Sequence, residues 1–108
     1  PADCRVSFEE HEASKASQMD TLAPEFEIAR EAISQEWEIE AAFIGCGGSI
    51  PIAGYFQQIT GVDPMLIGFA KDDDQIHSPN EKYDLESFQK GIRAWVRVIN
   101  SFAGLQNV

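Results

Sequence analysis

Residues 44–85 read IGCGGSIPIAGYFQQITGVDPMLIGFAKDDDQIHSPNEKYDL, and this stretch decides the expected fold. A short apolar run, residues 41–44, leads into a glycine-rich turn and then into the amphipathic segment of residues 50–60. A second apolar run, residues 65–69, ends in a polar loop that contains one histidine. Short apolar runs are typical of strands buried on both faces, and parallel strands need a crossover between them. The stretch therefore predicts a strand-helix-strand unit of an α/β protein, with two loops at the ends of neighbouring parallel strands.

Flanking helices are expected on both sides of this unit. Pro24 suits a first helical turn, and the apolar residues from Phe26 to Trp37 recur at three- and four-residue spacing, which predicts a helix over residues 24–37. Asp84 can cap a longer helix with one apolar stripe that we expect to face the core. That stripe consists of Leu85, Phe88, Ile92, Trp95, Ile99 and Phe102.

The N-terminal part of the chain gives a weaker pattern. The alternation in residues 5–8 predicts a short strand, and residues 9–19 are interpreted as the strand end followed by an exposed linker. The chain begins with Pro1 and not with Met, which indicates a piece cut from a longer protein.

Length and charge narrow the functional classes. A chain of 108 residues with 44% apolar residues can bury one modest core, so a single compact domain is expected. The net charge of −10, with no Lys/Arg cluster, argues against nucleic acid and anionic membranes as partners. No apolar run is long enough to cross a bilayer and no signal-peptide pattern occurs, so we expect a cytoplasmic protein. Two cysteines without CxxC spacing are interpreted as reduced thiols.

The glycine-rich turn is a candidate anion site. Gly45, Gly47 and Gly48 lie where the expected strand passes into a helix that Ser49 can cap, so backbone N–H groups and the helix dipole can attract a carboxylate or phosphate. Glycines also occur simply to permit a sharp turn and close packing, and the residues alone leave this alternative open. A nucleophilic role for Cys46 is disfavoured, because cysteines beside such turns usually act as small apolar residues.

The histidine loop is a candidate metal-binding segment. His77 follows the second expected strand, and a neutral imidazole is a good zinc ligand that nearby carboxylates can orient. The alternative is a surface histidine in a solvated acidic loop, because one histidine alone defines no metal site. Asp72, Asp73 and Asp74 lack EF-hand spacing and are interpreted as solvent-facing charges. His11 matches no metal motif and receives no role.

The segments GGSIP (residues 47–51) and DDQIHSPNEKYDL (residues 73–85) closely resemble the end of the zinc-dependent aminoacylase, dipeptidase and desuccinylase family of metallopeptidases. The resemblance extends over nearly all of the chain, which corresponds to only the last part of such an enzyme. It implies the C-terminal portion of a zinc-peptidase-like catalytic α/β domain. Residues 1–13 would be the end of an inserted lid domain used for dimerisation, residues 14–23 a linker, and residues 24–108 the C-terminal segment of the catalytic domain.

The resemblance also assigns roles to individual residues. Gly47, Gly48 and Ser49 would bind the carboxylate end of the substrate. His77 would be the last zinc ligand of the family's pattern.

Two positions would support that ligand and two depart from the family. Asn80 and Glu81 would support the histidine loop. Many members carry Arg-Glu before the two glycines, whereas this chain has Gly45 and Cys46. A guanidinium that could pair with a substrate carboxylate is therefore absent, which leaves the substrate preference open.

The mechanism implied by the resemblance is metal-assisted hydrolysis of an amide bond. In the family, two zinc ions share a bridging carboxylate and a water, and a glutamate takes the water's proton. No catalytic residue of that set has a match in this chain. The resemblance therefore implies the C-terminal fragment of a hydrolase, inactive alone, that acts on a dipeptide or an N-acyl amino acid with zinc or another divalent metal. Its expected partners are the rest of its parent chain and a second copy in a homodimer. The competing hypothesis is a non-catalytic acidic α/β module that binds a small anion or a partner protein.

Overall fold

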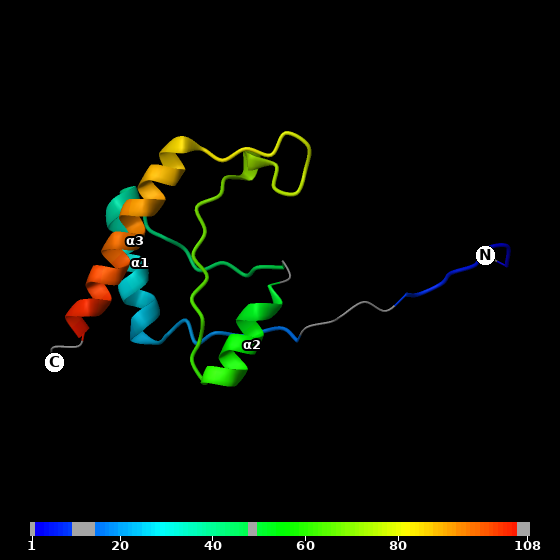
Figure 1. The fold of residues 1–108 in the computed structure, drawn as a ribbon, viewed down its shortest axis with the longest axis horizontal. Coiled ribbons are helices and arrows are strands. Elements are labelled where there is room, and N and C mark those ends of the chain that lie inside the picture. Colours follow the sequence, from blue (N-terminus) through cyan, green and yellow to red (C-terminus); the bar gives the residue numbers. More distant parts are fainter. Residues whose placement is uncertain (1, 10–14, 48–49, 106–108) are drawn as a thin grey trace. The chain divides into compact units, whose positions relative to one another are not determined.

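The computed structural model of the chain describes residues 2–9, 15–47 and 50–105. Its elements are the helices α1 (Pro24–Trp37), α2 (Pro51–Thr60) and α3 (Leu85–Leu105), with a short 3₁₀ turn, η1 (Asp72–Asp74), before α3 (Figure 1). The chain forms two compact units. Unit 1 comprises Pro1–Gln18 and Gly47–Pro64, and unit 2 comprises Met19–Cys46 and Met65–Val108.

The prediction of an α/β fold is wrong for the described residues, which contain helices and no β-strand. Residues 41–44 and 65–69, expected as buried parallel strands, have no regular secondary structure. Ile44 is 84% exposed, so the first run is not buried either. A strand exists only where a neighbouring segment pairs with its N–H and C=O groups. An apolar run does not encode that neighbour.

The short N-terminal strand predicted for residues 5–8 is also wrong. These residues have no strand assignment, and both Val6 and Phe8 are exposed. The alternation of polar and apolar residues indicates a strand only when one face has a surface to pack against. No such surface covers Val6 or Phe8 in the described parts of the chain.

The three predicted helices are confirmed, and local signals explain where they begin. α1 has a proline in its first turn and two early acidic residues, Glu25 and Glu27, which suit the positive end of the helix dipole. α2 also begins with a proline, and it ends at Gly61, whose left-handed φ of 71° lets its N–H donate to the carbonyl of Gln57. Asp84 caps α3, as its sequence position predicts.

In unit 1, α2 packs through its smallest residues against the segment before α1. Ala53 and Gly54 are buried, and a Cβ added at Gly54 would lie 2.8 Å from Ser17 Oγ. The Gln57 side-chain amide donates to the carbonyl of Gln18 at 3.0 Å and to Asp63 Oδ1 at 2.5 Å. In unit 1, these contacts hold α2 against residues 15–18, which have no regular secondary structure.

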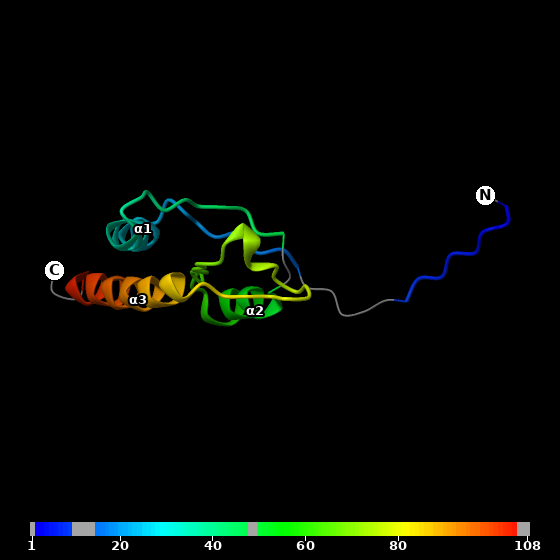
Figure 2. The same cartoon turned by 90° about the horizontal axis from the view of Figure 1, so that it is seen from above.

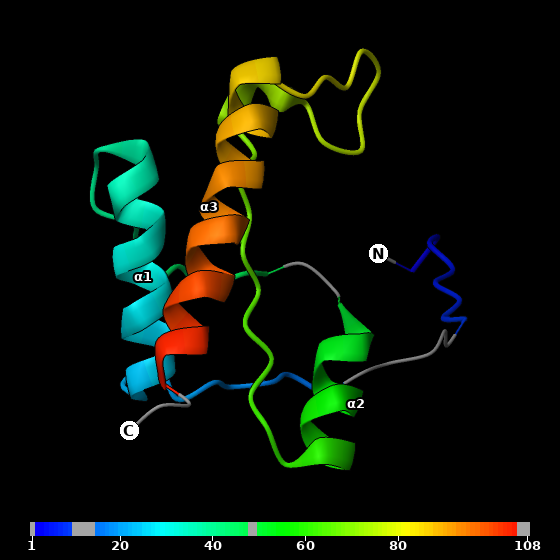
Figure 3. The ribbon, with the colours of Figure 1, turned by 60° about the vertical axis from the view of Figure 1, so that its left-hand side comes forward.

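In unit 2, α1 and α3 lie side by side (Figure 2) and run in opposite directions (Figure 3). The centre of their contact consists of small residues, namely Ala29 and Ala32 of α1 and Val98 of α3, with Ile33, Met65 and Phe102 packed around them. Small side chains let two helix backbones approach closely and bring many atoms into dispersion contact. Unit 2 is therefore built on a narrow core of small residues.

Apart from its last residue, Phe102, the predicted apolar stripe of α3 does not face this core. The buried face of α3 carries Ser87, Gly91, Ala94 and Val98, of which Val98 packs against Ala29 and Ala32 of α1. The larger apolar residues of the predicted stripe are exposed, and only Phe102 is half-buried. The expectation that the stripe faces the core is therefore wrong for the described residues. None of the helices within those residues is long and apolar enough to cross a membrane.

An ion-pair clamp joins the two helices of unit 2. Glu36 of α1 accepts from Arg93 Nε at 2.6 Å and from Arg97 Nε at 2.9 Å. The Glu36 side chain is only 7% exposed. Its hydrogen bonds to Arg93 and Arg97 hold the pKa of its carboxyl below the usual range. The clamp fixes the register of α3 against α1.

Candidate functional site

The histidine loop is closed at its base by a single buried carboxylate. Asp74 is 1% exposed, and its Oδ2 accepts from the backbone N–H of Lys71 at 2.8 Å. The backbone N–H of Asp74 donates in return to the carbonyl of Lys71 at 3.0 Å. This reciprocal pair closes the turn η1, with the Asp74 carboxylate reaching back to the N-cap N–H of Lys71, and it fixes the start of the loop.

Two lysines complete the anchoring of the loop. Lys82 Nζ lies 2.9 Å from Asp74 Oδ1 and 3.0 Å from Asp73 Oδ2. Lys71 Nζ lies 2.8 Å from Asp84 Oδ2, while the other oxygen of Asp84 caps α3. The loop is therefore attached both to its own start and to the first turn of α3.

Electrostatics within the loop favour the charged form of each partner. The backbone hydrogen bond from Lys71 and the side-chain hydrogen bond from Lys82 lower the pKa of Asp74. The hydrogen bonds to Asp74 and Asp73 raise the pKa of Lys82. The hydrogen bond from Lys71 likewise lowers the pKa of Asp84. Asp74, Lys82 and Asp84 therefore stay charged over the neutral pH range.

The backbone between these anchors adopts an unusual conformation at three residues. Gln75, His77 and Asn80 have φ values of 53°, 61° and 62°. Left-handed φ is uncommon for residues other than glycine and costs free energy, so it persists where surrounding contacts enforce it. The His77 side chain is exposed on this loop. Strained backbone of this kind is concentrated at functional sites, which supports a role for the segment.

The interpretation of Asp72, Asp73 and Asp74 as solvent-facing charges holds for two of the three. Asp72 and Asp73 are exposed, but Asp74 is a buried anchor that the sequence analysis missed. No sequence signal separates Asp74 from its two neighbours, because Lys71 has no side-chain acceptor that would mark a capping box.

As a metal ligand, His77 fits by donor type and exposure, because an accessible neutral imidazole is a common zinc donor. Among the described residues, however, no group of three or more His, Cys, Asp or Glu side chains could hold a metal ion. The described residues therefore contain no complete metal site of their own. The supporting roles of Asn80 and Glu81 stay predictions, although the Glu81 N–H closes a turn on the Ser78 carbonyl.

The glycine-rich turn is only partly described. Gly48 and Ser49, including the predicted helix cap, lie outside the described residues. Gly47 is exposed, and a Cβ added there or at Gly45 would meet no atom within 4 Å among the described residues. Close packing within this part of the chain therefore does not explain these two glycines. Cys46 is exposed and forms no disulfide, as is true of Cys4.

The predicted site residues are thus distributed over two units. His77, Asn80 and Glu81 lie together in the histidine loop of unit 2. Gly47 belongs to unit 1, which is described by itself. Within unit 2, the structure thus brings the proposed ligand loop together.

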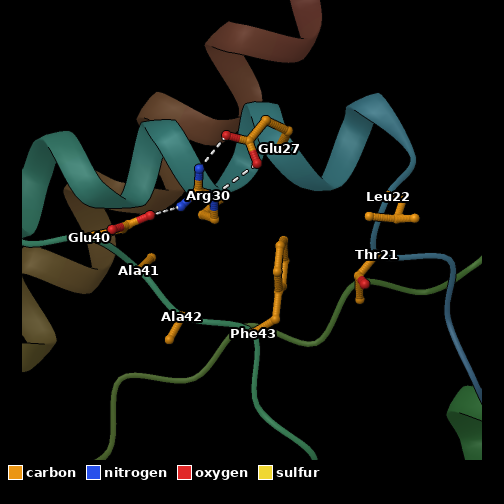
Figure 4. A pocket seen from close by; sticks show the side chains of 8 residues that line it. All are labelled: Thr21, Leu22, Glu27, Arg30, Glu40, Ala41, Ala42 and Phe43. Carbon is orange, nitrogen blue, oxygen red and sulfur yellow. Dashed lines mark hydrogen bonds and ion pairs between the residues drawn. The ribbon is translucent and has the colours of Figure 1, made fainter.

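A pocket that the sequence did not predict lies beside α1 in unit 2. It has a volume of about 590 Å³ and lies between α1 and the segment that follows it (Figure 4). Arg30 donates to Glu27 through Nε at 2.8 Å and Nη2 at 2.5 Å, and through Nη1 to Glu40. The hydrogen bonds to Glu27 and Glu40 raise the pKa of the Arg30 guanidinium. Since two carboxylates already neutralise Arg30, the pocket does not offer a free cation to an anionic ligand.

The chain belongs to Peptidase family M20/M25/M40, whose profile matches residues 4–101. The resemblance to a metallopeptidase family is thereby confirmed. Similar proteins include three Cys-Gly metallodipeptidases. That of Schizosaccharomyces pombe is 31% identical over 74% of this chain, that of Candida albicans is 35% identical over 68%, and that of Saccharomyces cerevisiae is 28% identical over 95%.

The matches cover only part of these relatives. The chain spans 17%, 15% and 21% of their lengths, about a fifth or less. No solved structure matches the chain. The family is therefore established for this chain, which corresponds to only part of a whole peptidase.

Proposed function

We propose that this chain is the C-terminal part of a metal-dependent hydrolase that cleaves the amide bond of a dipeptide or an N-acyl amino acid. The observation that carries the proposal is the histidine loop: a member of a peptidase family holds its IHSPNE segment in a strained, anchored conformation with an exposed imidazole. A surface loop without function has no need of a buried carboxylate to hold three left-handed residues.

In this proposal His77 is one metal ligand and the remaining donors come from outside the chain. The neutral imidazole of His77 would hold a divalent ion, for which zinc is the first candidate and a two-ion centre the expected form. Such an ion supplies Lewis-acid polarisation of the amide carbonyl and a water of lowered pKa. The chain's own part is to hold the imidazole in a fixed direction through Asp74 and Lys82.

The substrate end of the proposal rests on the glycine turn. Gly47, Gly48 and Ser49 would bind the substrate carboxylate through backbone N–H groups. This role suits the turn, because no packing contact within the described residues requires a glycine at position 47. Gly45 and Cys46 provide no guanidinium beside it, so recognition would depend on backbone donors. Because the similar proteins are named as Cys-Gly metallodipeptidases, the dipeptide Cys-Gly is the first substrate to test.

The partners of the chain follow from the same proposal. The rest of the parent enzyme would supply the other metal ligands and the general base, and it would cover apolar residues of α3 that are now exposed, such as Trp95 and Ile99. Residues 1–13 would end a lid domain used in a homodimer, and residues 14–23 would link it to the catalytic segment of residues 24–108. A cytoplasmic location accompanies this proposal.

The decisive experiment compares two histidine variants in the longer polypeptide that contains this chain. His77→Ala is expected to lower metal-dependent hydrolysis of Cys-Gly at least a hundredfold, because a metal ligand is lost, whereas His11→Ala serves as the matched control and keeps the activity. Unchanged activity after His77→Ala would overturn the proposal. It would favour the competing function, a non-catalytic acidic module that binds a small anion or a partner protein.

A second measurement tests the fragment itself. The 108-residue chain is expected to hydrolyse neither Cys-Gly nor N-acyl amino acids with zinc or manganese added, since the described residues offer no complete metal site. Metal-dependent turnover by this chain alone would contradict its assignment as an inactive part.

A further inference from the structure

We propose that Asp74 and Lys82 form a latch whose function is to position the imidazole of His77. The inference rests on the proposed role of His77 as a metal ligand and names two positioning residues for it. Neither residue is a metal donor in the proposal. Their effect is transmitted through the backbone of residues 75–81, the segment that they enclose.

The first step is the geometry of closure. Asp74 and Lys82 contact each other twice, through the backbone N–H of Lys82 and the carbonyl of Asp74 at 3.0 Å, and through Lys82 Nζ and Asp74 Oδ1 at 2.9 Å. Seven residues, 75–81, lie between Asp74 and Lys82, and His77 is the third of them. The latch therefore fixes both ends of a short loop relative to each other.

The second step is the strain that the latch must hold. Gln75, His77 and Asn80 all have left-handed φ, and each would relax to a more favourable conformation in an open loop. Two turn hydrogen bonds occur inside the loop, Ser78 N–H to Gln75 O at 2.9 Å and Glu81 N–H to Ser78 O at 3.3 Å. Local turns of this kind do not by themselves maintain three strained residues, so the closed base is needed.

The third step is the contrast between two neighbouring aspartates. Both contact Lys82 Nζ, but the side chain of Asp74 is 1% exposed and that of Asp73 is 72% exposed. A buried carboxylate that loses its charged partner keeps its desolvation cost, whereas an exposed one regains water. Asp74 is therefore the essential half of the latch, and Asp73 provides a matched control at the same loop position.

The consequence for function is that the latch fixes the position and direction of the His77 imidazole. A metal ligand acts only when its donor atom lies within a narrow range of position and angle, and supporting residues that hold the ligand typically change metal affinity about 10- to 100-fold when removed. An open latch leaves His77 present and exposed but conformationally averaged. Its imidazole would then bind metal more weakly without any change in its own chemistry.

The test uses the full 108-residue chain and three variants, Asp74→Asn, Lys82→Gln and the control Asp73→Asn. NMR measures both effects. Amide hydrogen exchange of residues 76–81 reports opening of the loop. The ring resonances of His77, followed during titration with zinc chloride, report contact with the metal. His11→Gln assigns the histidine resonances. We expect exchange in residues 76–81 to become about tenfold faster or more in Asp74→Asn and Lys82→Gln, with weaker zinc-induced shifts at His77, and no such change in Asp73→Asn.

Each outcome has a distinct meaning. Unchanged loop exchange in both Asp74→Asn and Lys82→Gln overturns the latch, even if zinc still shifts the His77 resonances. Because the other metal donors would come from outside this chain, the ligand role of His77 is decided separately, and it fails if His77→Ala leaves the hydrolysis by the longer polypeptide unchanged. Tryptophan fluorescence of Trp37 and Trp95 checks that the helix pair persists. Should Asp74→Asn unfold it, Lys82→Gln, which keeps the buried carboxylate bonded to Lys71 N–H, still decides the question.

Discussion

The two faces of α3 differ in the size of their side chains, and the smaller residues form the packed face. The buried face presents Ser87, Gly91, Ala94 and Val98, whose small side chains allow neighbouring segments such as α1 to approach closely. The adjacent face carries large apolar residues, of which Trp95 is 44% exposed. Large exposed apolar faces typically mark contact surfaces. The comparison teaches that, in this helix, packing within the chain uses shape complementarity and leaves the larger hydrophobic surface outside.

The largest expected effect comes from enlarging the packed face. Ala94→Leu places a branched side chain where Ala94 is fully buried, and overpacking of this kind costs about 1–3 kcal/mol. We expect the free energy of unfolding of unit 2, measured by urea denaturation with tryptophan fluorescence, to fall by an amount near the top of that range. Val96→Leu on the exposed face is the matched control and should change stability little. Equal effects of the two substitutions would remove the distinction between the faces.

The second prediction concerns the edge of the packed face, where Glu36 holds Arg93 and Arg97. A carboxyl whose pKa is lowered on folding stabilises the fold above its ordinary value of 4.5, and that stabilisation is lost as the pH falls through the lowered folded-state pKa. We therefore expect the Tm to drop as the pH falls below about 4.5. Glu36→Gln should lower the Tm at pH 7 by a few degrees and flatten the acid dependence.

Carboxylates outside the clamp share this acid range, among them Glu27, Asp74 and Asp84. The pKa values of Asp74 and Asp84 are lowered from 3.8, so they add stability that is also lost in acid. The Glu36→Gln profile should therefore flatten without becoming level. An acid dependence identical to that of the unmodified chain would show that the clamp contributes nothing in solution.

The positions of the helices could be predicted from the sequence, but the sheet and the orientation of α3 could not. Helix starts are encoded locally, by Pro24, by Pro51 and by the capping side chain of Asp84. A strand depends on a partner segment that a run such as residues 41–44 does not specify. Likewise, the hydrophobic period of α3 shows that the helix is amphipathic without showing which neighbour covers which face.

The candidate site, too, could be predicted from the sequence only where the signal is local. The motif around His77 could be found from the sequence, because a histidine in that segment resembles a known ligand position. The burial of Asp74 could not, since three consecutive aspartates look equally solvated until the backbone closes around one of them. The pairing of Lys82 with that carboxylate spans eight positions in the sequence and depends on the left-handed turns between them.

The third prediction, with a smaller effect on stability, compares substitutions at two glycines, Gly91 and Gly47. At Gly91 an added Cβ would lie 2.9 Å from Cδ2 of Phe69, whose ring stacks on Trp37 with centroids 5.6 Å apart. Gly91→Ala should therefore lower the free energy of unfolding by about 1 kcal/mol, because the clash exceeds the gain in helix propensity. Gly47→Ala meets no atom in the described structure and should leave stability unchanged. A stabilised Gly91→Ala chain would indicate that the Phe69 ring moves aside freely.

The smallest expected effect on stability lies on the large apolar face. Ile99→Ser replaces an exposed side chain by one of similar helix propensity, so the free energy of unfolding should change by less than about 0.5 kcal/mol. The same substitution interrupts the apolar surface and should reduce self-association of the chain, measured by static light scattering over a range of concentrations. Ser101→Ala is a control that leaves the stripe intact. If Ile99→Ser destabilises the chain as strongly as Ala94→Leu, the large face is part of the folding core, and the functional distinction between the two faces of α3 fails.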